Sequence, residues 1–356
     1  MSCNHLLGAS ANNSFNCFTL RSLRLCGSIA AFRLIAVAAL FLLTVSACSP
    51  LVNHPGTQVS APKIEKNSFI TADGSLLPLR SWLPGETSTR AVIIALHGFN
   101  DYSNFFTSSG TYLSSRGIAC YAYDQRGFGG APGRGLWSGA EAYTNDLSSF
   151  VREIRTLHPG IPHYVLGDSM GGAVTIVAMT GSNPPDVDGV ILVAPAVWGR
   201  DTMPWYQRWL LAVGSYTVPW MELTGKGLKI TASDNIEMLR ALGRDPLIIR
   251  ATRIDTMYGL TNLMDMALER AQQLKLPTLV QYGEKDQIIP PKPMLLMLEK
   301  MPESTRKAFY KNGYHMLLRD LQGEKPLADI VAWIADYKQP LPYGTDIWKK
   351  SGKQSN

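Results

Sequence analysis

Residues 167–171 read Gly-Asp-Ser-Met-Gly and so have the spacing Gly-x-Ser-x-Gly. The strand-like residues 163–166 precede this motif, and the apolar residues 173–179 that follow it indicate a helix. A serine with this spacing between a strand and a helix sits on a sharp turn that exposes its hydroxyl. The two glycines suit the close backbone approaches of such a turn. We therefore expect Ser169 to be a nucleophile that projects above a sheet.

A serine hydroxyl is a weak nucleophile at neutral pH and needs a base, which in turn needs a carboxylate to orient it. The chain has six histidines, and only His315 follows Ser169. In hydrolases with this turn the order along the chain is serine, acid, histidine. Asp286, just after the predicted strand 276–282, is the predicted acid, and Glu284 is the alternative. Chain order and strand-end positions thus predict a catalytic triad of these residues.

Ester or amide cleavage also needs hydrogen-bond donors for the negative charge that develops on the carbonyl oxygen. The N–H of Met170 begins the predicted helix and can face that oxygen. The continuous apolar run 91–96 predicts a central parallel strand, which should lie beside the Ser169 strand and ends at His97. We expect the N–H of Phe99 to be the second donor, and His97 to be structural rather than catalytic.

Other chemistries find little support in the sequence. The glycine-rich residues 127–130 are not followed by Gly-Lys-Ser/Thr, so they do not predict a nucleotide phosphate loop. No histidine or cysteine cluster has the spacing of metal ligands, and we expect neither a metal nor a cofactor. The formal net charge is +6, but residues 1–47 hold three arginines and no acidic residue, which leaves +3 for the rest. This mild charge does not predict a nucleic-acid partner.

The N-terminal region has the pattern of a bacterial export signal. Arg33 is followed by the apolar run 34–45, which is short for a membrane span, and then by small residues before Cys48. The ending Val-Ser-Ala-Cys resembles the lipobox of bacterial lipoproteins. That resemblance implies that residues 1–47 are a signal peptide and that Cys48 is diacylated and becomes the first mature residue. An uncleaved anchor, or cleavage without lipidation, is the alternative.

Lipidation would make the membrane a partner through Cys48, since two or more acyl chains hold a protein firmly to a bilayer. Residues 48–66 contain several prolines and would form a flexible tether. Ser49 resembles a signal for the outer membrane in bacteria with two membranes, which places the protein in the cell envelope. In the mature chain only Cys120 would remain free, in an apolar strand, so no internal disulfide is expected.

Strands alternate with helices through most of the chain, which predicts a mostly parallel, doubly wound α/β sheet. Residues 67–195 and 275–340 form this predicted core, and residues 341–356 a C-terminal tail. The alternation stops in residues 196–274, which we interpret as an inserted helical cap. This stretch is rich in methionine and holds four of the eight tryptophans, some of which would simply be the core of the cap: Trp198, Trp205, Trp209 and Trp220.

The motifs together resemble the α/β-hydrolase family, closest to its monoacylglycerol lipase and lysophospholipase branch. The resemblance spans roughly residues 68–337 and implies an α/β-hydrolase fold and a cofactor-free enzyme that cleaves esters of glycerol-linked fatty acids. Asp168, where that branch commonly has histidine, and the sequence of residues 99–101 depart from its pattern. The motifs that carry the resemblance are His97-Gly98, Asp124-x-Arg126-Gly127-x-Gly129, Gly167 to Gly172, Gly283-x-x-Asp286 and Tyr314-His315-x-Leu317.

The sequence therefore predicts a membrane-tethered serine esterase with Ser169 as nucleophile, Asp286 as acid, His315 as base, and Phe99 and Met170 as oxyanion donors. Its small-molecule substrate would be a monoacylglycerol-like or lysophospholipid-like ester. Two alternatives remain open: a peptidase or amidase of the same fold, and a non-catalytic lipoprotein that binds a lipid or a partner.

Overall fold

A nine-stranded β-sheet is the centre of the part of the chain that the computed structural model describes, residues 49–85 and 87–346. The chain divides into two units, Met1–Ser49 and Pro50–Asn356, and the sheet belongs to the second. In spatial order its strands are β1 (Lys63–Glu65), β2 (Ser68–Ile70), β3 (Leu76–Trp82), β5 (Ile118–Tyr123), β4 (Ala91–Leu96), β6 (His163–Asp168), β7 (Gly189–Val193), β10 (Thr278–Gly283) and β11 (Arg306–Tyr310).

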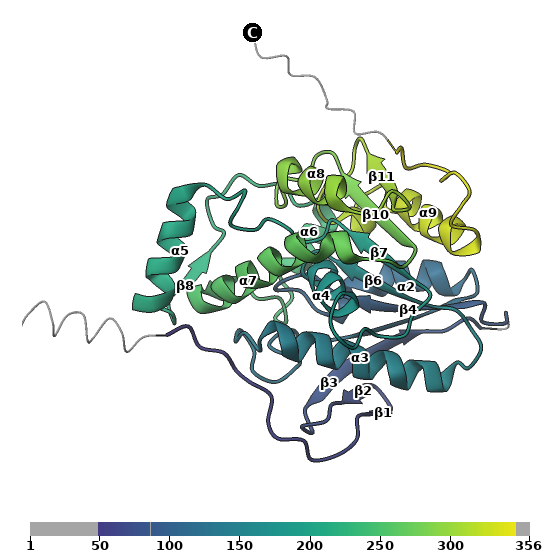
Figure 1. The fold of residues 1–356 in the computed structure, drawn as a ribbon, viewed down its shortest axis with the longest axis horizontal. Helices are drawn as coiled ribbons and strands as arrows, with labels where there is room; N and C mark the ends of the chain where they lie inside the picture. Colours follow the sequence, from purple (N-terminus) through teal and green to yellow (C-terminus); the bar gives the residue numbers. More distant parts are fainter. Residues whose placement is uncertain (1–48, 86, 347–356) are drawn as a thin grey trace, which may run out of the picture. The chain divides into compact units, whose positions relative to one another are not determined.

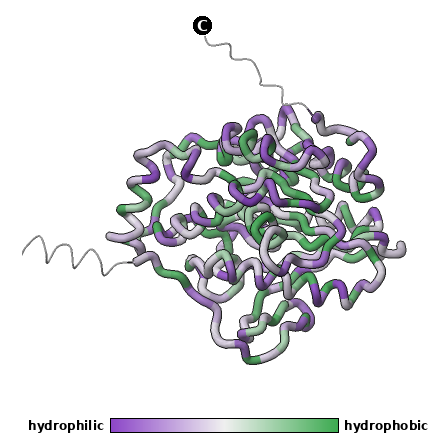
Figure 2. The backbone as a smooth tube through the Cα atoms, in the orientation of Figure 1, coloured by the Kyte–Doolittle hydropathy of each residue, from purple (hydrophilic) through white to green (hydrophobic). Residues whose placement is uncertain are grey.

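The six strands from β5 to β11 in this order are parallel, whereas β1, β2 and β3 run antiparallel to their neighbours. Every residue of β4 and β5 is buried, as expected for strands that are covered on both faces. In Figure 2 these central strands form the most hydrophobic part of the tube. The predicted α/β-hydrolase fold with a mostly parallel sheet is confirmed.

Helices cover both faces of the sheet and bury two separate hydrophobic cores (Figure 1). One core is formed with α3 (Ala140–Leu157), α4 (Met170–Met179) and α8 (Pro291–Lys300). The other is formed with η1 (Ser103–Phe106), α2 (Thr107–Ser114), η3 (Leu317–Arg319) and α9 (Glu324–Ala335). The sheet is therefore covered by helices on both faces.

The segment between β7 and β10 contains helices, as predicted for the cap, and also a two-stranded antiparallel sheet that was not predicted. Its elements are α5 (Trp205–Thr217), β8 (Glu222–Thr224), α6 (Ile236–Leu242), β9 (Ala251–Arg253), α7 (Ile254–Arg270) and η2 (Ala271–Gln273). Helix α7 packs on α4. Trp198 and Met264 join the core, whereas the other three tryptophans of this segment are exposed.

Residues 50–66 do not form the flexible tether predicted for 48–66. The N–H of Asn53 donates to the carbonyl oxygen of Trp137 at 2.8 Å, and that of Val59 donates to the carbonyl oxygen of Ala72 at 2.8 Å. Strand β1 then pairs with β2. The prediction rested on proline content, whereas backbone donors of this segment find acceptors elsewhere in the second unit.

The described start of the predicted C-terminal tail is also held in place. Phe309 of β11 and Thr345 exchange two backbone hydrogen bonds, and the N–H of Tyr343 donates to Asp329 at 2.9 Å. Thr345 therefore forms an isolated antiparallel bridge with β11, the edge strand of the sheet.

The predicted signal peptide and Cys48 lie outside the described residues. Within residues 49–85 and 87–346, no helix is both long and apolar enough to cross a membrane. Cys120 is a free, buried residue of β5, in agreement with the predicted strand, and burial raises the pKa of its thiol to about 12.

Candidate active site

Ser169 lies on the turn between β6 and α4 and has an unusual backbone conformation. Its φ of 50° and ψ of −113° are rarely adopted by residues other than glycine. Two backbone hydrogen bonds of 2.9 Å hold the turn, one from the N–H of Ser169 to Val193 and one from the N–H of Ala196 to the carbonyl of Ser169. The strain is thus maintained by the neighbouring strand, as in the predicted nucleophile turn.

The glycines on either side of Ser169 are required by close backbone contacts. A Cβ atom at Gly171 would overlap the carbonyl oxygen of Leu96 at the end of β4, and one at Gly167 would lie 2.5 Å from the carbonyl oxygen of Gly171. The prediction that these positions leave no room for a side chain is confirmed.

Ser169, His315 and Asp286 lie in a row, although they come from three separate loops. The Nε2 atom of His315 is 3.0 Å from the Oγ of Ser169, and its Nδ1 is 2.8 Å from Oδ2 of Asp286. All three residues are more than 90% buried. The other oxygen of Asp286 accepts hydrogen bonds from the N–H groups of Ile288 and Ile289. This arrangement leaves the Asp286 carboxylate fixed and aimed at the imidazole.

The environment of His315 favours the state that a general base needs. The Asp286 carboxylate accepts a hydrogen bond, so the ring proton belongs on Nδ1, and Nε2 is left to accept the hydroxyl proton of Ser169. Burial by itself lowers the pKa of His315, but the charge and hydrogen bond of Asp286 outweigh it and raise the pKa above its usual value. The imidazolium formed during proton transfer is therefore stabilised.

Backbone hydrogen bonds tie the loops of the acid and the histidine to each other. The N–H of Glu284 donates to the carbonyl of Tyr310 at 3.0 Å, and that of Lys285 donates to the carbonyl of Gly313 at 2.9 Å. These bonds continue the parallel pairing of β10 with β11. Glu284, the alternative acid, is not the residue that contacts His315, because the carboxylate that lies within hydrogen-bond distance of Nδ1 is that of Asp286.

The loop after β4 passes directly over the Ser169 turn. A Cβ atom on Gly98 would lie 3.3 Å from Cβ of Ser169, so the backbone that carries the Phe99 N–H is close to the hydroxyl. Met170 is the first residue of α4, and the first N–H groups of a helix lack intrahelical acceptors. Both predicted oxyanion donors thus come from segments that adjoin Ser169.

His97 anchors this loop to the neighbouring strand end. Its Nε2 accepts a hydrogen bond of 2.9 Å from the N–H of Gln125, and its Nδ1 therefore donates to the carbonyl of Gly98 at 2.8 Å. The Gln125 side chain returns a bond to the carbonyl of His97. Full burial lowers the pKa of His97, which keeps the ring neutral. His97 thus has contacts that fit the structural role expected for it.

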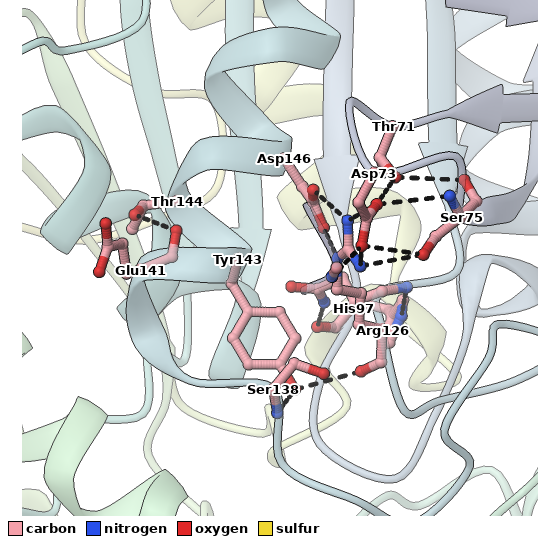
Figure 3. A network of polar contacts seen from close by, with 12 residues as sticks. Thr71, Asp73, Ser75, His97, Arg126, Ser138, Glu141, Tyr143, Thr144 and Asp146 are labelled. Atoms are coloured by element: carbon pink, nitrogen blue, oxygen red, sulfur yellow. Dashed lines mark hydrogen bonds and ion pairs between the residues drawn. The ribbon is translucent and has the colours of Figure 1, made fainter. Parts of the chain in front are cut away.

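A buried ion-pair network holds Arg126, which follows Gln125 in the loop after β5. Figure 3 shows Arg126 between Asp73 and Asp146, with N···O distances of 2.8 and 2.6 Å. The Tyr143 hydroxyl donates to the carbonyl of Arg126 at 3.1 Å. The Arg126 guanidinium holds the pKa of Asp73 well below its usual range, whereas burial raises that of Asp146 to about 6. This network was not predicted, because its acids lie far from Arg126 in the chain.

A second missed cluster lies beside the triad. Asp168 is buried, and its Oδ1 has no hydrogen-bond partner among the described residues. Burial is the main reason that the pKa of Asp168 rises to about 8. Arg319 lies 3.5 Å from Asp101 and acts on both acids electrostatically. Only the departure at Asp168 from the family pattern signalled this cluster in the sequence. Within the described ranges, no group of side chains is suited to hold a metal ion.

The sheet, the strained serine turn and the row of serine, histidine and carboxylate define a serine hydrolase of the α/β-hydrolase fold. The chain belongs to the Hydrolase_4 family, described as serine aminopeptidase, S33, whose model matches residues 87–322.

Relatives of known name agree with this class. A monoacylglycerol lipase of Mycolicibacterium smegmatis is 27% identical over 298 residues, which cover 78% of this chain and 99% of that protein. A monoglyceride lipase of Rattus norvegicus is 27% identical over 286 residues, covering 78% and 93%. The structure of a soluble variant of monoglyceride lipase from Saccharomyces cerevisiae, in complex with a substrate analog, has a TM-score of 0.66 at 19% identity and covers 81% of this chain and 100% of that one. The protein is a carboxylic ester hydrolase that uses a serine.

Proposed function

We propose that the protein hydrolyses esters of glycerol-linked fatty acids, of the monoacylglycerol or lysophospholipid type, through an acyl-enzyme on Ser169. The observation that carries this proposal is the continuous hydrogen-bonded row from Ser169 through His315 to Asp286. The choice of substrate is supported by the relatives that are named monoacylglycerol lipases.

In the first half of the reaction, His315 Nε2 takes the hydroxyl proton while Ser169 Oγ attacks the ester carbonyl carbon. Negative charge collects on the carbonyl oxygen, where the N–H groups of Phe99 and Met170 stabilise it. Each such donor contributes about 10² to 10³ to the rate. The imidazolium then gives its proton to the departing glycerol oxygen, the ester C–O bond breaks, and the acyl group stays on Ser169.

In the second half, water replaces the alcohol. His315 takes a proton from the water as its oxygen attacks the acyl carbon, and the same N–H groups stabilise the second tetrahedral intermediate. Collapse of this intermediate returns the proton to Ser169 Oγ and releases the fatty acid. Asp286 keeps its charge throughout and stabilises the imidazolium in both halves.

We further propose that Cys48 is diacylated and that residues 1–47 are then removed, which would hold the enzyme at the surface of a bacterial membrane. The support is the Val-Ser-Ala-Cys ending behind a short apolar run. Ser49 favours the outer membrane if the source has two membranes. Mass spectrometry of the purified mature protein tests this: a diacylated Cys48 at the new N-terminus is expected, and a free Cys48 thiol would refute it.

The catalytic proposal is tested with Ser169→Ala and a panel of monoacylglycerols and lysophospholipids. The variant should lose on the order of 10⁶ of ester hydrolysis, because the triad acts as a unit. Ser148→Ala, which removes a partly buried hydroxyl on α3, is the matched control and should keep full activity. A fluorophosphonate probe should label the wild type and the control but not Ser169→Ala. Hydrolysis retained by Ser169→Ala would end the proposal.

Amide cleavage is the second candidate, favoured by the family description as serine aminopeptidase. Amino-acid amides measured beside acyl esters at equal concentration decide between the two. If the ester proposal is correct, kcat/KM should be much higher for the acyl esters. A higher kcat/KM for the amides would instead identify the protein as a peptidase or amidase.

A further inference from the structure

The loop after β4, which carries the proposed oxyanion donor Phe99, forms a turn over residues 98–101. The N–H of Asp101 donates to the carbonyl of Gly98 at 3.4 Å and closes the turn. Asn100, the third residue of the turn, has a φ of 65°, in the left-handed region that glycine and asparagine adopt more readily than other residues. The residue type at position 100 therefore bears on the path of this loop, which we call the oxyanion turn.

The oxyanion turn determines where the N–H of Phe99 points. This N–H and the carbonyl of Gly98 belong to one trans peptide, so they point in opposite directions. The Gly98 carbonyl accepts hydrogen bonds from the Nδ1 of His97 at 2.8 Å and from the N–H of Asp101. Rotation of this peptide would break both bonds and direct the donor away from the proposed position of the oxyanion.

The cap holds Asn100 by its backbone and by its side chain. The N–H of Ile249 donates to the Asn100 carbonyl at 3.1 Å. The Nδ2 of Asn100 donates to the Oγ1 of Thr252 at 2.8 Å, and Thr252 is buried. Both partners belong to residues 245–252, which we call the cap segment. The cap segment thus binds the oxyanion turn at the residue with the left-handed backbone.

The cap segment is itself held at both of its ends. At its start, the hydroxyl of Tyr102 donates to Asp245 at 2.7 Å. The guanidinium of Arg134 donates to the carbonyls of Pro246 and Leu247 at 2.7 and 2.8 Å. The end of the segment belongs to β9, which pairs with β8. The partners of Asn100 therefore have a defined position relative to the active site.

The backbone conformation alone does not explain an asparagine at position 100. Glycine adopts a φ of 65° without strain and would leave the bond from Ile249 to the carbonyl intact. What asparagine adds is the hydrogen bond to the buried hydroxyl of Thr252. The side chain of Asn100 thus has a contact whose contribution can be separated from that of the turn.

We propose that Asn100 is a positioning residue of the oxyanion hole: its bond to Thr252 fixes the oxyanion turn to the cap segment and so directs the N–H of Phe99 toward the reacting oxygen. The proposal rests on the proposed function, in which Phe99 is an oxyanion donor. Asn100 itself need not touch the substrate. The cap would then contribute to the rate of the chemical step.

The first test is Asn100→Gly in the purified protein, with a short-chain soluble ester as substrate. The variant keeps the turn and loses the bond to Thr252. Its kcat should fall about tenfold, less than the 10² to 10³ lost when a donor is removed, because the N–H is misdirected and still present. KM should stay within about twofold, since the loss falls on the transition state. The pH profile should keep the wild-type inflection, because His315 and Asp286 are unchanged.

An inhibitor reports on the oxyanion hole directly. A trifluoromethyl ketone bonds to the Oγ of Ser169 as a hemiketal, with the serine proton on His315 and the negative oxygen in the hole. Its inhibition constant should rise by about the same factor as kcat falls, since the hemiketal resembles the transition state.

Variants of Thr252 test the same bond from the other side. Thr252→Val removes the acceptor and should resemble Asn100→Gly, whereas Thr252→Ser keeps the hydroxyl and should retain most of the activity. The double variant Asn100→Gly/Thr252→Val should lose no more than either single variant, because both remove one interaction. The matched control is Thr261→Val, which should keep full activity. Thr261 is also a buried threonine of the cap, and its hydroxyl bonds to the carbonyl of Met257 in its own helix.

Thermal unfolding identifies the variants that fold, and Thr252→Val carries the test if Asn100→Gly does not. Unchanged kcat in these two variants would overturn the proposal, and so would additive losses in the double variant. A loss of kcat without a parallel loss of inhibitor affinity, or with a shifted pH inflection, would also overturn it. Lack of ester hydrolysis by the wild type would refute the proposed function and this proposal with it.

Discussion

The Nε2 atom of His315 lies 3.0 Å from the Oγ of Ser169, although 146 positions separate the two residues. The contact exists because β6, which precedes Ser169, and β11, which precedes His315, run parallel in one sheet and end at the same edge. Strand β10 lies between β7 and β11 and brings Asp286 behind the imidazole. The geometry of the row is therefore a property of the sheet.

Asp286→Asn should lower kcat for ester hydrolysis by about 10⁴, because the amide can hold the imidazole in the wrong tautomer. The pH profile should change as well. The base acts when neutral, so wild-type activity rises with pH through the pKa of His315, which Asp286 raises above its usual value although burial lowers it. Loss of the carboxylate charge destabilises the imidazolium, and the rise should move to lower pH. Steady-state rates across pH 5 to 9 measure both effects, and an unchanged inflection would contradict the coupling.

Asp168→Asn should alter how stability depends on pH. The folded-state pKa of Asp168 is raised to about 8, so between about pH 4 and 8 the folded protein holds a proton that the unfolded chain releases. The wild type should thus lose stability relative to the variant as pH rises, by at most about 1.4 kcal/mol per pH unit. Urea unfolding at pH 5, 6.5 and 8 checks this. Asp186→Asn, whose side chain is 83% exposed, should leave the wild-type slope unchanged.

Gly171→Ala should abolish most activity and reduce stability by more than 1 kcal/mol, because the new Cβ overlaps the carbonyl oxygen of Leu96 and displaces the Ser169 turn. Gly181→Ala is the control, since its Cβ meets nothing closer than 3.4 Å. Thermal unfolding and fluorophosphonate labelling are the readouts. If both variants behaved alike, the backbone contact at Gly171 would not be what fixes the turn.

Arg126→Met should reduce the free energy of unfolding by about 3–5 kcal/mol, since it leaves Asp73 and Asp146 buried without their partner. Arg155→Met breaks ion pairs with the exposed Asp186 and Asp188 and should cost less than about 1 kcal/mol. Urea titration of both variants makes the comparison. An equally small loss of unfolding free energy in both variants would contradict a stabilising role of the Arg126 ion pairs.

Chain order and strand ends were enough to anticipate which side chains meet at Ser169, since both follow from the sheet topology. The choice of Asp286 over Glu284 also agrees with the contact in the structure. The Arg126 network could not be predicted, because any of many acids could have paired with that arginine. The hydrogen bonds of His97 could not be predicted either, because they depend on where Gln125 lies in space.

The cap and the N-terminal segment were predicted less well. Strands β8 and β9 are three residues each, too short for an alternating pattern to be recognised. Residues 50–66 have a composition typical of a linker, and their attachment depends on acceptors such as the carbonyls of Ala72 and Trp137. The composition of residues 50–66 does not indicate whether other parts of the chain offer acceptors for their backbone N–H groups.

The pairing of β1 with β2 also decides where the enzyme can be shortened. A fragment that starts at Asn67 would lose β1 and expose the unpaired backbone of β2, and open strand edges are the usual starting points of aggregation between copies. It would also release Trp137 and Asp73 from their contacts with Asn53 and Gly56. Soluble material for crystallisation and enzymology should therefore begin no later than Pro50.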